Sequence, residues 1–460
     1  MNTPPRASCS GQPWLPALCV ALLASGTGTG CATIRRAREA QDSARVPPGE
    51  RTVTAAEAGL SSNTVLAIDE ALRIGLQWSP VVVQARQALV SADQQVRQAR
   101  SAYLPTADTG AGVRRATSNS GQQEASGNSS KSYSASVSAD LLLYDFGRTP
   151  AAVREVVLRL LAAEARLRAV ENSTAYQIRT GLYDLLRAQE LLIVAQENER
   201  QYKVRLGQVR ALAEVGRRIK YDITKAEVDL GNAEVTLIDA RNAVRTARAT
   251  LNRRLGLAEE PGYRVADPPA VAPPAGFEDL MKAARERQPE LASLRAEEKA
   301  ASAVVDQAVA DLYPSLRASG EYGWGGGSFP LIWNWAAGLS GSLNLFSGWR
   351  KTSRVDQSVA QLRSARAATA EREQRIYEDL SRAWAQSESA RERQSVTELT
   401  VRQARETLEL VVERYRLGKA SSVELTDAQV ALTTARAEQV RARYDYLSAV
   451  AAIQYTIGEK

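Results

Sequence analysis

The sequence predicts a mainly α-helical fold with a β-barrel part, in which one helix–β-hairpin–helix unit occurs twice. An internal repeat is the first observation: Arg350 follows Arg148 by 202 positions, as Gly418 follows Gly216. The second is the absence of proline between Pro150 and Pro261 and after Pro330, which permits very long helices. The third is a period-two alternation of apolar and polar residues before each copy of a shared motif, LLLYDFGR and LNLFSGWR. Such alternation is typical of strands, so each unit combines helices with strands.

The first thirty residues predict a secretory signal peptide. They contain a lone Arg6, an apolar core LPALCVALLA and small residues before Cys31. The cysteine follows Thr29 and Gly30, a pattern that resembles a lipoprotein cleavage box, so Cys31 is the predicted N-terminal lipid anchor. Ordinary cleavage near Ala32 is the alternative. Cys9 and Cys19 leave with the signal, and one remaining thiol cannot form a disulfide within the chain.

The repeat defines the expected domain organisation. After the signal peptide (1–30), an anchor and linker (31–65) precedes the first repeat (66–256), a Pro-rich linker (257–276) and the second repeat (277–460). Upstream prolines repeat at 209 positions (Pro80 with Pro289, Pro105 with Pro314), so seven residues are lost before Arg350. We place this seven-residue difference in length in the loop between the two strands of each hairpin, where SNSGQQEASGNSS in the first copy corresponds to GGGSFP in the second.

Each repeat is expected to contain a long helical hairpin. Thr149 and Pro150 read as the N-cap and first turn of a helix that continues to about Ala213. Some 60 residues at ~1.5 Å each would span about 90 Å. In the second copy, apolar residues step by three and four, as in a coiled coil, at Val401, Ala404, Leu408, Val411 and Tyr415. Gly216 and Gly418 fall where each hairpin would turn back.

The strand segments predict one β-hairpin per repeat. SYSASVSADLLLYDF and WNWAAGLSGSLNLF alternate over more than ten residues, with Leu141 and Leu343 on the apolar side and Ser138 and Ser342 on the polar side. TADTGAGVRR and SLRASGEYGW supply their partners. Four strands are too few to close a membrane barrel, which needs about eight or more. Closure therefore requires several copies of the chain.

The order of the duplicated motifs resembles the TolC family of bacterial outer-membrane factors. IDEALRIGLQWSP, AYLP, LLLYDFGR and EVGRRIKYDITKAEV are followed by DLYP, LFSGWR and RYRLGKASSVELTDAQVAL. The resemblance implies a homotrimer with a 12-stranded transmembrane β-barrel, continued by a long α-helical periplasmic barrel. It also implies a passive outer-membrane duct for small-molecule efflux, which docks through a periplasmic adaptor (membrane fusion protein) onto an inner-membrane pump. The expected location is the outer membrane of a Gram-negative bacterium, in contact with its lipid and extending into the periplasm. A type I protein secretion channel remains an alternative, and a coiled-coil adaptor lipoprotein a weaker one.

The family's gate lies at the periplasmic helix tips, where acidic, tyrosine and arginine side chains narrow the bore. The resemblance carries this role to Asp222, Glu424, Asp427, Tyr415, Arg217, Arg218 and Lys220. Where some members have a gate arginine, this chain has Ala420. The alternative is that these charges are ordinary solvated turn residues.

The composition argues against an enzyme and against a nucleic-acid partner. The chain has no histidine and one cysteine beyond the signal peptide, so the commonest general base, metal ligand and thiol nucleophile are nearly all missing. The net charge is +7, but basic and acidic residues are interleaved along the helices. We expect no catalytic residues, no cofactor, no metal and no nucleic acid.

Overall fold

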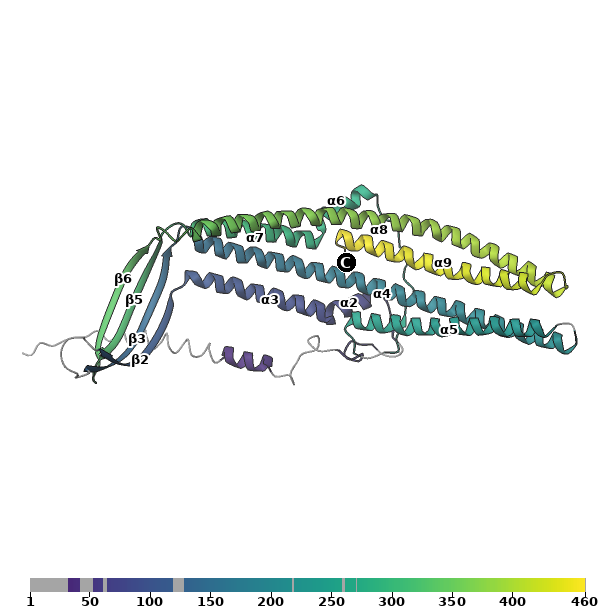
Figure 1. Cartoon of the computed structure of the whole chain (residues 1–460), viewed down its shortest axis with the longest axis horizontal. Helices are drawn as coiled ribbons and strands as arrows, with labels where there is room; N and C mark the ends of the chain where they lie inside the picture. Colours follow the sequence, from purple (N-terminus) through teal and green to yellow (C-terminus); the bar gives the residue numbers. More distant parts are fainter. Residues whose placement is uncertain are drawn as a thin grey trace, which may run out of the picture.

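The computed structural model describes residues 32–41, 53–60, 64–118, 128–216, 219–258, 261–269 and 271–459. The predicted signal peptide, Cys31, Arg217 and Arg218 lie outside these residues. Figure 1 shows long helices running side by side, with a strand sheet at one end and two helical turns at the other.

The duplication extends to the bounds of the helices. The first repeat contains α2 (Ile68–Trp78), α3 (Pro80–Arg100), β2 (Thr106–Ser118), β3 (Asn128–Tyr144), α4 (Arg148–Glu214) and α5 (Lys220–Leu255). The second contains α6 (Phe277–Arg287), α7 (Pro289–Ala310), β5 (Ser315–Gly326), β6 (Ile332–Ser342), α8 (Arg350–Arg416) and α9 (Ser422–Ile457). Helices α8 and α9 begin and end 202 positions after α4 and α5, and helices α6 and α7 begin 209 positions after α2 and α3. The predicted repeat of helices around a β-hairpin is confirmed.

The helices α4 and α8 each contain 67 residues, which is about 100 Å at ~1.5 Å per residue. The predicted N-cap of the first was wrong, because α4 begins at Arg148 and Gly147 occupies the cap position with a left-handed φ of 94°. The side chain of Asp145 does the capping: its Oδ2 accepts bonds from the Thr149 amide (2.8 Å) and hydroxyl (2.6 Å). Thr149 is therefore held by the cap and is not the cap itself.

The four long strands form one antiparallel sheet in the order β2-β3-β5-β6 (Figure 1). The second predicted strand was too long, since β6 ends at Ser342 and Leu343 and Leu345 lie beyond it. Ser342 pairs with Ser315, the first residue of β5. The residue before it is Pro314, which has no amide hydrogen to extend the ladder, so the pairing stops there.

The two faces of the sheet differ in chemistry. Cross-strand register places Tyr322 opposite Trp335 and Trp324 opposite Trp333 on one face, with Leu141 beside Ala318 farther along. Trp335 is 68% exposed in the single chain. The other face carries Ser138 between Asp108 and Glu321. The predicted alternation is thus confirmed, with an apolar, aromatic face and a polar face that carries charges of both signs.

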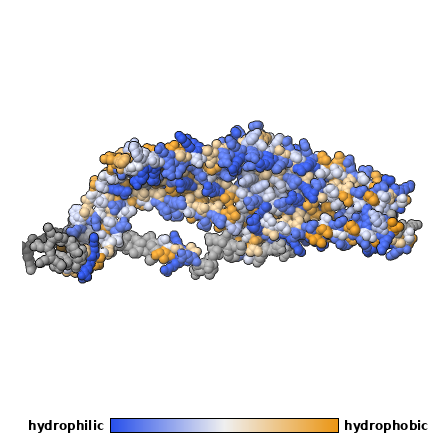
Figure 2. All heavy atoms as spheres, in the orientation of Figure 1, coloured by the Kyte–Doolittle hydropathy of each residue, from blue (hydrophilic) through white to orange (hydrophobic). Residues whose placement is uncertain are grey.

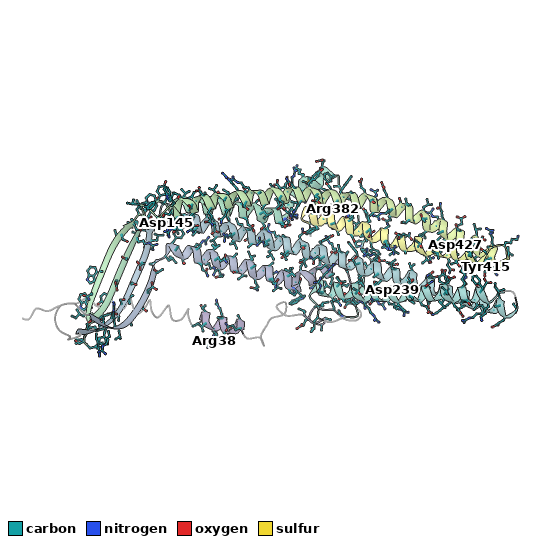
Figure 3. The ribbon with its side chains drawn as sticks, in the orientation of Figure 1. Arg38, Asp145, Asp239, Arg382, Tyr415 and Asp427 are labelled. Carbon is teal, nitrogen blue, oxygen red and sulfur yellow. The ribbon has the colours of Figure 1, made fainter. Side chains whose placement is uncertain are left out.

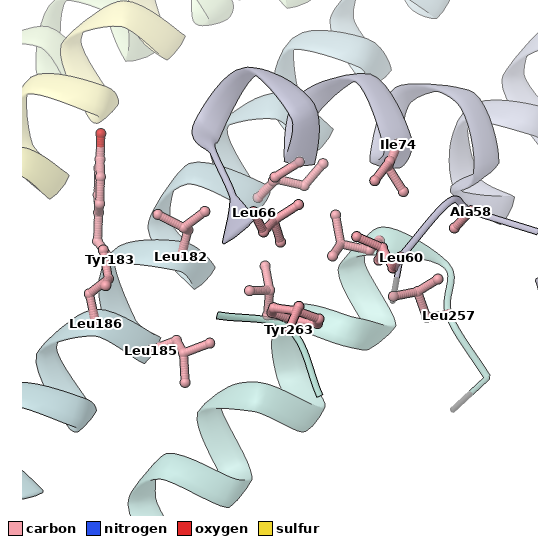
Figure 4. Close-up of a cluster of buried hydrophobic side chains, with 14 of the residues drawn as sticks. Ala58, Leu60, Leu66, Ile74, Leu182, Tyr183, Leu185, Leu186, Leu257 and Tyr263 are labelled. Atoms are coloured by element: carbon pink, nitrogen blue, oxygen red, sulfur yellow. The ribbon is translucent and has the colours of Figure 1, made fainter. Parts of the chain in front are cut away.

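Hydrophobic cores lie where short elements pack on the long helices. In the first, β1 (Val65–Leu66) pairs with β4 (Arg264–Val265) and packs with α2 against α4. Leu66, Leu182 and Tyr263 are almost fully buried there (Figure 4). A second cluster joins α6 and α7 to α8 and α9. Elsewhere the helical surface interleaves hydrophilic and hydrophobic residues (Figure 2). Among the described helices, none has a stretch both long and apolar enough to cross a membrane.

Candidate gate at the helical tips

The two helical hairpins turn at the same end of the molecule, opposite the sheet (Figure 1). Gly216 follows α4 with a φ of 73°, and Gly418 follows α8 with a φ of 71°. These left-handed conformations favour glycine at the C-terminal ends of helices. Each glycine lies just after the long helix of its repeat, and the predicted gate residues of both repeats that the structure describes lie at this end.

At the first tip, Lys220 and Asp222 lie in the first turn of α5. Lys220 is exposed and Asp222 is half-buried. The N-cap residue is Ile219, which offers no side-chain hydrogen bond to the helix. A carboxylate in the first turn is favourable because it faces the positive end of the helix dipole. Asp222 therefore has a local stabilising role that is independent of any gate.

At the second tip, Glu424 forms a capping box with Ser421. The Ser421 hydroxyl accepts a bond from the Glu424 amide (3.1 Å), and Glu424 Oε1 accepts one from the Ser421 amide (3.1 Å). Arg414 of α8 lies 3.9 Å from Glu424 Oε2. The hydrogen bonds with the Ser421 backbone and then its side chain lower the pKa of Glu424, and the charge of Arg414 adds to this effect. Glu424 is thus held as a carboxylate.

The other two predicted residues of the second tip lie close to this box. Tyr415 is half-buried near the end of α8, and Asp427 is exposed one turn into α9 (Figure 3). Tyr415 lines a groove of about 740 Å³ between α4, α8 and α9, together with Leu408, Leu425 and Gln429. The structure therefore brings Tyr415, Glu424 and Asp427 together within one hairpin.

Sequence reasoning missed a set of partly buried polar contacts between α4 and α9 beside the tips. Arg205 of α4 is 6% exposed and donates to the Thr426 hydroxyl and the Ser422 carbonyl, both at 2.8 Å. Farther from the tip, Gln429 donates to Gln201 and Thr433 to Asn198. The available signal was polar side chains spaced three and four apart, at positions 198, 201 and 205, in a stretch of α4 that also buries Ala195, Leu206 and Val209.

An aromatic-faced sheet continued by helices of about 100 Å defines the subunit of an outer-membrane channel. The chain belongs to the outer membrane efflux protein family, whose sequence profile matches residues 72–257 and 280–459. It is an outer-membrane exit duct that extends into the periplasm, as the resemblance to the TolC family implies.

Curated relatives and solved structures agree with this assignment. The chain is 22% identical to the outer membrane efflux protein BepC of Brucella suis over 375 residues. This alignment covers 80% of the chain and 79% of the relative. It is 24% identical over 343 residues to the alkaline protease secretion protein AprF of Pseudomonas aeruginosa, with 71% and 70% covered. The fold matches the Campylobacter jejuni outer membrane channel CmeC with a TM-score of 0.78 at 16% identity, over 85% of each chain. These relatives are named as efflux, secretion and channel proteins.

Proposed function

We propose that three copies of the chain form a passive duct that carries small molecules from an inner-membrane pump across the outer membrane. The observation that carries this proposal is the open sheet. In the described sheet β2 and β6 each pair on one side only, and they are 13 and 11 residues long. Unpaired strand edges in lipid leave backbone groups without hydrogen bonds, so β6 of one copy must pair with β2 of the next. Three copies give twelve strands, as in the family.

Two apolar stripes near the tips support docking of a periplasmic adaptor. Tyr221, Val228 and Val235 are exposed along α5 at intervals of seven residues. Val423 and Val430 are exposed at the equivalent positions of α9. A seven-residue spacing is the pattern by which one helix packs against another. These stripes fit the helical hairpins of an adaptor that links the duct to its pump.

Crosslinking in cells tests the partner and the transported class together. A photoreactive residue at Val228 or Val430 should capture an adaptor and its pump, and the same residue at exposed Ile193 of α4 serves as the control. A drug-type pump in the crosslinked complex supports small-molecule efflux. A pump of a type I protein secretion system would support the alternative, which the similarity to AprF favours.

We further propose that the tips form a cation-attracting gate. Asp222, Glu424 and Asp427 of three subunits would surround a narrow bore, and Tyr415 would narrow it. Arg217, Arg218 and Lys220 would pair with the acids and hold the tips closed. Like charges in a constriction repel unless they are countered by cations or basic side chains. In planar bilayers the wild type should show low, cation-selective conductance. The double variant Asp222→Ala with Glu424→Ala should show larger and less selective conductance, and unchanged values would make these acids solvated turn residues.

The N-terminal anchor is a separate proposal. Acylation at Cys31 would attach the mature chain to the membrane in addition to its strands. Mass spectrometry of the mature N-terminus should find a lipid-modified Cys31. An unmodified start at Ala32 or later would remove the anchor and leave the duct proposal intact.

A further inference from the structure

Buried and half-buried polar side chains join the second helical hairpin to the first. Arg205 of α4 donates through Nη1 to the Thr426 hydroxyl and through Nη2 to the Ser422 carbonyl. Two further hydrogen bonds join the same pair of helices at 2.9 and 3.0 Å. We name this set the α4–α9 seam; it comprises Asn198, Gln201 and Arg205 with Ser422, Thr426, Gln429 and Thr433.

The contact within the first hairpin has a different character at the same level. There Leu206, Val209 and Ala226 form a small apolar cluster between α4 and α5. Arg210 pairs with Glu227 of α5 at 2.7 Å, and both side chains remain about half exposed. Arg205 and Arg210 are thus close on one helix but hold different partners. Arg205 reaches α9, and Arg210 reaches α5.

The surroundings of Arg205 make its geometry specific. Its guanidinium is buried, yet in the described part of the chain no carboxylate pairs with it, and its hydrogen bonds go to a hydroxyl and a backbone carbonyl. A buried charge needs well-aligned hydrogen bonds because it has lost its water. The two acceptors must therefore stay where Arg205 can reach both of them, which fixes the first turn of α9 against α4.

The first two turns of α9 carry the acidic residues of the second tip. Ser422 lies two residues before Glu424, and Thr426 immediately precedes Asp427. We propose that Arg205 is a positioning residue for the gate: by binding Ser422 and Thr426 it holds Glu424 and Asp427 at the bore, and so sets the cation selectivity of the duct. This inference rests on the proposed acidic gate and adds a residue that does not itself line it.

The experiment measures the reversal potential of purified full-length protein in planar bilayers under a KCl gradient. Arg205→Met removes the donor, and Thr426→Val removes one acceptor without changing any charge. We expect both variants to lose part of the preference for K⁺ over Cl⁻, and Arg205→Lys to restore part of it. If Arg205 acted only through its charge, Arg205→Met would instead increase the preference for K⁺ over Cl⁻, because removing a positive charge near an acidic bore makes the bore more cation-selective.

Arg210→Met is the matched control, since it removes the same charge from the same helix without touching the seam. Its selectivity should be unchanged or slightly higher. A higher cation preference in Arg205→Met, or wild-type selectivity in Thr426→Val, would overturn the inference. Trimer retention on gels and helical circular dichroism check assembly of each variant. A non-selective wild type would instead refute the acidic gate itself, so the two failures are distinguishable.

Discussion

The two repeats secure their long helices at opposite ends. In the first, Asp145 caps α4 beside the sheet, whereas Ile219 offers α5 no side-chain cap at the tip. In the second, Trp349 offers α8 no side-chain cap beside the sheet, and Ser421 with Glu424 caps α9 at the tip. The position equivalent to Asp145 is Ser347. The backbone architecture is thus the same in both copies, while the side chains that stabilise the helix ends differ.

This difference shows which features the architecture requires. Glycines with positive φ recur at the equivalent C-terminal ends of the helices, Gly216 with Gly418 and Gly256 with Gly458, because no other residue adopts that backbone as easily. A cap, in contrast, needs only one side chain. A helix of 67 residues remains stable without a side-chain cap at one end, because packing along its length stabilises it. The first junction also links the repeats directly, since Arg148 pairs with Asp311 of α7 at 2.9 Å. The side-chain cap of a long helix therefore lies beside the sheet in the first repeat and at the tip in the second.

The largest expected effect follows from breaking the cap beside the sheet. Asp145 is 5% exposed and accepts two hydrogen bonds, so Asp145→Ala should cost about 2 to 3 kcal/mol of stability. Ser347→Ala, the equivalent change in the second repeat, should be close to neutral. Thermal unfolding of the detergent-solubilised protein, followed by circular dichroism, measures both. Equal melting temperatures for the two variants would refute the comparison.

The sequence predicted the fold, but it did not predict which helix ends carry a side-chain cap in each repeat. Helix lengths, turn glycines and strand alternation follow from local patterns, and they were predicted because each depends on nearby residues. The N-cap at Thr149 was misplaced because the hairpin exit through Gly147 moves the capping role to Asp145. The strand end at Leu345 was misplaced because the pairing stops at Pro314, a distant residue in the sequence.

The candidate site was predictable in part. The tip acids could be located by their distance from the two glycines. The partners of Arg205 could not be predicted, because they lie more than 200 residues away in the sequence and depend on how α4 packs against α9. The role of Glu424 as a cap was likewise missed, although the sequence SSVE contains the Ser-x-x-Glu signature of a capping box.

The second prediction compares equivalent leucines near the ends of β3 and β6. Leu141 lies within β3 on the aromatic face, whereas Leu343 lies beyond the end of β6. Leu141→Asp should cost roughly 1 to 2 kcal/mol in the membrane, because it places a carboxylate against lipid. Leu343→Asp should cost less, and Ser138→Asp on the polar face should be mild. Folding into lipid vesicles across a urea series gives the three values, and an equal cost at Leu141 and Ser138 would mean that the faces are misassigned.

The third prediction concerns the cap at the tip. Ser421→Ala removes the hydroxyl that accepts the Glu424 amide, and should cost about 1 kcal/mol of local stability. Ile219→Ser, the equivalent position of the first repeat after the 202-residue offset, would create a cap where none is present and should slow exchange there. Hydrogen exchange of the amides in the first turns of α9 and α5 reports the two effects separately. Unchanged exchange in α9 after Ser421→Ala would show that packing alone holds this turn.

The smallest expected effect is a pH dependence confined to the second tip. The pKa of Glu424 is lowered in the folded protein, chiefly by the hydrogen bonds with Ser421. A carboxyl group with a depressed pKa contributes stability that is present above its unfolded pKa, about 4.3, and is lost as pH falls through the folded value. Hydrogen exchange in the first turn of α9, corrected for the intrinsic rate, should therefore accelerate as pH falls below this range. Glu424→Gln keeps a hydrogen-bonding side chain but cannot titrate, so it should abolish the acceleration. If the acceleration persists in Glu424→Gln, the pH dependence has another origin and the capping box makes no contribution to it.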